Sequence, residues 1–189
     1  MATVFQKKLA SVALGAYEKF HLLRENQEPL LSQIEQYWIA TVGRFPGISE
    51  PWSAVFISWC VKQSGATSNE FTFASAHSVF CFHAIANTKN QVGVFHGRNP
   101  HEYAPKVGDI LQNNRSKNSF DFAYAATHKN YKSHSAIVIE TGSDQKGRYL
   151  RTVGGNENDS VGMKEVRLSK NGIVINTTKL YISVIDTLL

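Results

Sequence analysis

A serine and a histidine that lie far apart in the sequence each have surroundings suited to nucleophilic catalysis. Ser53 lies in residues 51–60, PWSAVFISWC, which indicate the start of an amphipathic helix. His134 precedes the apolar run SAIVI at residues 135–139, which indicates a buried strand. The unpaired N–H groups at a helix N-terminus favour an ionised nucleophile and can hold an oxyanion. The sequence therefore makes Ser53 a candidate nucleophile.

A serine nucleophile needs partners, because its hydroxyl holds its proton tightly at neutral pH. His134 is the candidate general base, and Asn156, which follows the Gly154-Gly155 turn, is the candidate that orients the imidazole. Each residue also has a simpler interpretation. Ser53 fits an ordinary first-turn helix serine, His134 a histidine at a strand entrance, and Asn156 a turn residue with a left-handed backbone. The chemistry requires the fold to bring the three together.

The composition favours an ordinary globular protein. The 189 residues are 42% hydrophobic and 19% charged, which suits one domain with a core. The net charge of +5 comes from scattered lysines and arginines, so nucleic-acid binding is not expected. No segment approaches the ~20 apolar residues of a membrane span, and the N-terminus lacks a signal-peptide pattern. The chain is expected to be made in the cytoplasm.

The cysteines and histidines show no metal-binding spacing. Cys60 and Cys81 lie on predicted helices and are interpreted as buried thiols, although a disulfide between them stays open. The loop histidines also lack ligand-like spacing, so neither a metal nor a cofactor is expected.

The order of the predicted elements indicates an α+β fold. Apolar repeats predict helices from Phe5 to Leu23, from Pro29, from Pro51 at the first helical position to Gly65, and from about Ser75 to Asn87. Short apolar runs predict strands at residues 107–111, 135–139, 149–153, 166–168, 173–175 and 180–185. Helices followed by strands imply an antiparallel sheet. We expect one domain over residues 1–189, with N-terminal helices at 1–48, the nucleophile helix and its successor at 49–88, and the sheet at 105–189. The polar segment 113–133 is expected to be a lid over a groove or a mobile insertion.

Four segments carry a family resemblance. Residues 51–59, PWSAVFISW, followed by Gly65, resemble the PWCAxFVSW helix of the papain-like CHAP and NlpC/P60 peptidoglycan hydrolases. Residues 105–111, PKVGDIL, are similar to their P-x-x-GD-[LI]-[LIV] strand. Residues 134–139 resemble their HxGIV strand, and residues 153–156, VGGN, their EGN segment. The serine, the later Ala76-His77 pair and the GGN segment most resemble the DUF2272 family, over about residues 29–161.

The resemblance implies a papain-like fold, with N-terminal helices packed on a C-terminal antiparallel sheet. It also implies that Trp52 and His77 contribute to substrate binding. Two departures matter: Ser53 replaces the family cysteine, and Gly154 replaces the glutamate of the EGN segment. The serine-bearing relatives favour a native serine, although an engineered replacement of cysteine stays open.

The expected function is hydrolysis of an amide bond in the peptide part of bacterial peptidoglycan. Ser53 attacks, His134 accepts the proton and Asn156 orients His134. The alternatives are an inactive envelope-binding module and an esterase or acyltransferase on the same fold. An antibacterial toxin or effector, or a phage lysin, would act in the periplasm or cell envelope after export or lysis. An immunity protein or a secretion machinery is then a possible partner, and the oligomeric state stays open.

Overall fold

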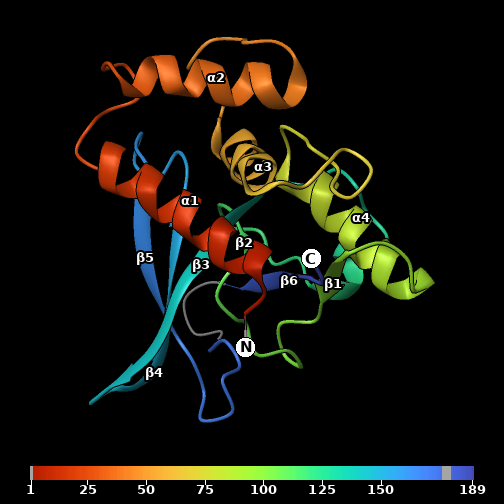
Figure 1. The fold of residues 1–189 in the computed structure, drawn as a ribbon. Coiled ribbons are helices and arrows are strands. Elements are labelled where there is room, and N and C mark those ends of the chain that lie inside the picture. Colours follow the sequence, from red (N-terminus) through yellow and green to blue (C-terminus); the bar gives the residue numbers. More distant parts are fainter. Residues whose placement is uncertain (1, 176–179) are drawn as a thin grey trace.

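The chain folds into one α+β unit in a computed structural model that describes residues 2–175 and 180–189 (Figure 1). The helices are α1 (Val4–Phe20), α2 (Leu30–Val42), α3 (Ser53–Ser64), α4 (His77–Asn90) and the short α5 (Phe122–Ala125). The strands are β1 (Phe95–Arg98), β2 (Ile110–Asn114), β3 (Ser133–Asp144), β4 (Gly147–Gly154), β5 (Gly162–Arg167) and β6 (Tyr181–Thr187). Among these helices, none is both long and apolar enough to cross a membrane.

All six strands belong to a single antiparallel sheet with the order β1-β6-β2-β3-β4-β5. The pairing of β2 with β3 places Asn113 opposite His134. β6, the last strand of the chain, lies between β1 and β2 and therefore joins the two parts of the sheet.

The main core lies between the helices and one face of the sheet. It includes Ile110, Ile137, Val153 and Ile185 from the strands, with the apolar faces of α1 to α4 packed against them. α1 and α3 both contact β3, and α2 packs on α3 farther from the sheet (Figure 1). A smaller cluster around Leu150 covers the other face.

The predicted α+β class with an antiparallel sheet is confirmed. The predicted position of Pro51 was wrong: Trp52 is the N-cap of α3, Ser53 is its first residue, and Pro51 lies outside. The run at 173–175 forms an isolated bridge between Leu168 and Val174. Two elements, β1 and α5, were missed because each has only 4 residues and so carries little periodic signal.

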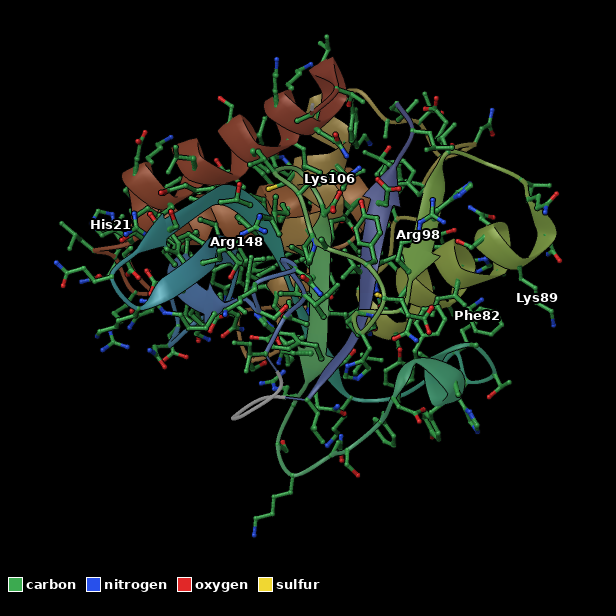
Figure 2. The ribbon with its side chains drawn as sticks, turned by 90° about the horizontal axis from the view of Figure 1, so that it is seen from below. His21, Phe82, Lys89, Arg98, Lys106 and Arg148 are labelled. Atoms are coloured by element: carbon green, nitrogen blue, oxygen red, sulfur yellow. The ribbon has the colours of Figure 1, made fainter. Side chains whose placement is uncertain are left out.

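Polar contacts join the turn before β2 to β6. The buried Asp109 accepts hydrogen bonds from the Lys106 N–H at 2.8 Å and from Gln6 Nε2 at 3.3 Å. Arg98 and Lys106, both labelled in Figure 2, form ion pairs with Asp186 of β6 at 3.2 and 3.3 Å. Burial raises the pKa of Asp109 to about 7. The turn is thereby fixed against both the first helix and the last strand.

The start of α3 is held by very close packing against the turn after β4. Trp52 is fully buried, and its Nε1 donates a hydrogen bond to Glu25 Oε2 at 2.8 Å. A Cβ atom at Gly155 would lie 2.6 Å from Phe56 Cβ and 2.7 Å from the Trp52 ring. No side chain therefore fits at Gly155, and its backbone rests directly on the first turn of α3.

We predict that Gly155→Ala lowers the free energy of unfolding by about 1–3 kcal/mol, because overpacking forces Trp52 or Phe56 to move. Gly15→Ala is the matched control: Gly15 lies in α1, and a Cβ there would meet nothing within 4 Å. Alanine should stabilise that helix by about 0.5–1 kcal/mol. Urea denaturation measures both changes. Equal effects of the two substitutions would contradict the packing argument.

Candidate active site

Ser53 is the first residue of α3 and opens onto a cavity. Its side chain is buried, with 3% exposure, and α3 has no side-chain cap at its N-terminus. The N–H groups of the first turn thus have no capping side chain, and the positive end of the helix dipole lies at the hydroxyl. These are the surroundings in which a serine oxyanion and a tetrahedral oxyanion are stabilised.

The hydroxyl of Ser53 is hydrogen-bonded to His77, not to His134. Ser53 Oγ lies 2.8 Å from His77 Nε2, and both side chains are buried. Within the described residues, the other ring nitrogen, Nδ1, has no hydrogen-bond partner. Burial, followed by the electrostatic interactions with His134 and Arg115, holds the pKa of His77 well below its usual value. His77 is therefore neutral at physiological pH.

His134 lies beside His77 and pairs with a carboxylate. The two imidazole rings have centroids 5.2 Å apart and meet edge to face. Nε2 of His134 lies 2.8 Å from Glu157 Oε1, and Lys164 of β5 contacts the other carboxylate oxygen. Burial alone would raise the pKa of Glu157, but the hydrogen bond and charge of His134 and the ammonium of Lys164 lower it to about 2. Glu157 is therefore ionised and can stabilise a positive charge on His134.

The turn that carries Glu157 is built from residues that tolerate a left-handed backbone. Asn156, Asn158 and Asp159 have φ values of 54°, 54° and 60°, a conformation that Asn and Asp adopt more readily than most residues. The Glu157 N–H donates to Ser160 O at 2.9 Å and closes the turn.

The segment after α1 fixes this turn from outside. Arg24 donates to Asn158 O at 2.9 Å, the Glu25 N–H donates to Asp159 O at 2.8 Å, and Ser160 Oγ donates to Phe20 O at 3.1 Å. Because Glu25 also holds Trp52, the same short segment positions both the carboxylate and the start of α3.

A cavity of about 540 Å³ joins these groups. Its lining includes Ser53, His134, Asn156 and Glu157, together with residues 113–119. Asn114 fixes the base of this loop: its side chain donates to Phe120 O and Leu180 O at 2.8 and 3.0 Å and accepts from the Phe120 N–H at 2.9 Å. The polar segment 113–133 therefore contributes one wall of the cavity, and α5 lies near its middle.

The structure brings together most of the residues expected from the sequence, with different contacts. Ser53, His134 and Asn156 line one cavity. His77 is hydrogen-bonded to Ser53 but is not part of the cavity lining. Within the described residues, the side chain hydrogen-bonded to His134 is that of Glu157 and not that of Asn156. The side chain of Trp52 is fully buried, so it cannot contact a substrate directly and instead anchors α3.

Glu157 is a candidate functional residue that sequence reasoning missed. Comparison with the EGN pattern draws attention to a missing glutamate before Asn156, whereas a glutamate follows directly after it. The sequence feature that could have revealed it is NEND at residues 156–159. Asn and Asp favour a left-handed backbone, and a turn of this kind changes the direction of the Glu157 side chain. Gly154 leaves room for the pair, since a Cβ there would lie 3.1 Å from His134 Nε2.

The described residues include two free thiols and no cluster of metal-ligating side chains. In residues 2–175 and 180–189, no group of three or more His, Cys, Asp or Glu side chains could hold a metal ion. Cys60 and Cys81 are both buried free thiols, and burial raises the pKa of Cys81 to about 12. Such thiols remain protonated and unreactive.

The chain matches a known protein family over most of its length. Residues 27–184 match the family described as "Uncharacterized protein conserved in bacteria (DUF2272)". The chain belongs to this family. The match includes Ser53, His77, His134 and Glu157, so the whole cavity centre lies inside the family region. Searches of curated proteins and of solved structures gave no match.

The depressed pKa of His77 predicts a pH-dependent stability. Below the unfolded-state pKa of about 6.5, the unfolded chain binds a proton that buried His77 does not, so the free energy of unfolding falls as the pH is lowered. Asp109, with its raised pKa, contributes the opposite slope. The difference between the wild type and His77→Gln therefore isolates His77. Urea denaturation from pH 7.5 to 5.5 should show a greater loss of stability for the wild type, and parallel curves would refute this.

Proposed function

We propose that this protein is a serine-dependent amide hydrolase of the papain-like type, acting on the peptide part of bacterial peptidoglycan. The observation that carries the proposal is the grouping of Ser53, at the uncapped N-terminus of α3, with His77 and the His134–Glu157 pair at one cavity. The resemblance of the PWSAVFISW helix and the HSAIVI strand to CHAP and NlpC/P60 hydrolases supports both the fold type and the substrate class.

His134 is the better general base, because only it has a counter-ion for the charge it would gain. An imidazolium at His77 would be buried and would have no hydrogen-bond partner for Nδ1 among the described residues. His134, by contrast, contacts the ionised Glu157, and its side chain retains 13% exposure. In this proposal His77 Nε2–H donates to Ser53 Oγ, which leaves the hydroxyl proton free to pass to His134.

The reaction then follows the serine acyl-transfer scheme. Ser53 Oγ attacks the carbonyl carbon while its proton moves to His134, and the N–H groups of the first turn of α3 stabilise the oxyanion. His134 gives the proton to the leaving amine as the C–N bond breaks. Water, deprotonated by His134, then attacks the acyl carbon; the acyl–Oγ bond breaks, and His134 returns the proton to Ser53 Oγ.

Bacterial peptidoglycan is the proposed partner, and the proposed place of action is the cell envelope, after export or cell lysis. An antibacterial effector with an immunity protein and a phage lysin both fit this proposal. The identity of neighbouring genes distinguishes these settings, since an immunity gene accompanies an effector and a holin gene accompanies a lysin.

Incubation with purified sacculi, followed by mass spectrometry, tests the activity. We predict new peptide amine and carboxyl ends with the wild type and a loss of at least about 1000-fold with Ser53→Ala. Ser11→Ala, on the exposed face of α1, is the matched control and should retain full activity. Binding of sacculi without cleavage would indicate an envelope-binding module. Cleavage only of ester substrates, with fluorophosphonate labelling of Ser53, would indicate an esterase.

Two histidine substitutions separate the base from the positioning residue. We expect His134→Gln to lower activity by about 10²–10⁴-fold and to abolish the decline toward acid pH that comes from protonating the base. His77→Gln should lower activity by roughly 10–100-fold and preserve that decline, because it only misplaces the hydroxyl. A pH–rate profile for each variant measures this. The reverse pattern would make His77 the base.

A further inference from the structure

The cavity beside Ser53 has an excess of positive charge. Its lining contains three cations, Arg115, Lys117 and Lys164, and one carboxylate, Glu157. Glu157 is already bound by His134 and by Lys164. Neither Arg115 nor Lys117 forms an ion pair with any residue in the described ranges. Two cations at the mouth of the cavity are therefore available to a ligand.

From this charge distribution we infer that Arg115 and Lys117 bind a free carboxylate of the substrate close to the bond that is cut. The inference rests on the proposed function and adds the chemical class of the substrate, a peptide with an acidic group next to the scissile amide. Charge-assisted hydrogen bonds from a guanidinium to a carboxylate are among the stronger polar contacts in proteins and impose geometry as well.

The loop that carries the two cations is fixed at both ends. Asn114 joins its start to Phe120 and Leu180 through three hydrogen bonds, and Asn118 Nδ2 donates to Lys132 O at 3.2 Å. Arg115 follows directly after Asn114, so its backbone is held at the cavity wall. A fixed backbone lowers the entropy lost when a carboxylate is bound.

An apolar cavity next to the first one favours a peptide ligand over a densely charged polyanion. A second cavity of about 390 Å³ shares Asn113, Glu157 and Lys164 with the first. Its lining includes the apolar side chains Leu111, Ala136, Met163 and Val166. A ligand that spans both cavities would place a carboxylate at one end and a small aliphatic group at the other.

Arg115 also lies near enough to the Ser53–His77 pair to act on it electrostatically. Its positive charge contributes, after burial and the interaction with His134, to the lowered pKa of His77. A substrate carboxylate bound by Arg115 would therefore lie near Ser53.

Binding to the Ser53→Ala protein tests the inference without turnover. Calorimetry would compare muropeptides before and after conversion of their carboxylates to methylamides. We expect roughly tenfold or greater loss of affinity on methylamidation, and a similar loss for native muropeptides with Arg115→Gln or Lys117→Gln. Lys129→Gln, which removes the same charge from an exposed site outside the cavity lining, should change affinity less than twofold. Equal affinity for native and methylamidated muropeptides would overturn the inference and leave the proposed function intact.

A second probe is independent of the cell wall. N-acetylglutamate should produce saturable NMR shifts in residues 115–119 that its neutral diamide does not produce, and Arg115→Gln should abolish them. If these shifts occur but no muropeptide binds, the carboxylate site stands and the peptidoglycan assignment fails. If N-acetylglutamate produces no shift and no muropeptide binds, both fail. Shifts with inorganic phosphate at equal ionic strength that exceed those with the carboxylate would assign the cations to phosphate instead.

Discussion

The contact between Gly155 and the first turn of α3 is the constraint on which the candidate site depends. Two chain segments far apart in sequence meet there with no space for a side chain. Trp52 and Phe56 form one side of this contact, and the turn that carries Glu157 forms the other. The separation between Ser53 and Glu157 is thus set by close packing.

Two imidazoles at 5.2 Å cannot both carry a charge without strong repulsion, and the protein gives them different surroundings. One ring is fully enclosed and stays neutral, whereas the other touches an ionised carboxylate. In the proposed mechanism His77 therefore orients the Ser53 hydroxyl, and His134 carries the transient positive charge. Burial and one acidic side chain thereby give two chemically identical groups different properties.

The sequence predicts the α+β class, the antiparallel sheet and the positions of the four long helices from the spacing of apolar and turn residues, although the apolar period of α4 is weak. It also identifies Ser53, His134 and Asn156 as neighbours through the resemblance. It does not identify Glu157 as the partner of His134. That contact depends on the positive φ values of Asn156, Asn158 and Asp159, which cannot be read from the sequence. The hydrogen bond between Ser53 and His77 was missed for a similar reason. It depends on how the start of α4 docks beside α3, which is a tertiary property.

The order of the strands has a consequence for synthesis of the protein. β6 fills the gap between β1 and β2, and it comes last in the sheet along the chain. While a ribosome is still making residues 181–187, β1 has no strand to pair with, and β2 can pair only with β3. The ion pairs of Asp186 with Arg98 and Lys106, and the hydrogen bond from Asn114 to Leu180 O, are also absent at that stage. A nascent chain should consequently lack a finished cavity wall, so the candidate site is completed only after β6 has been made.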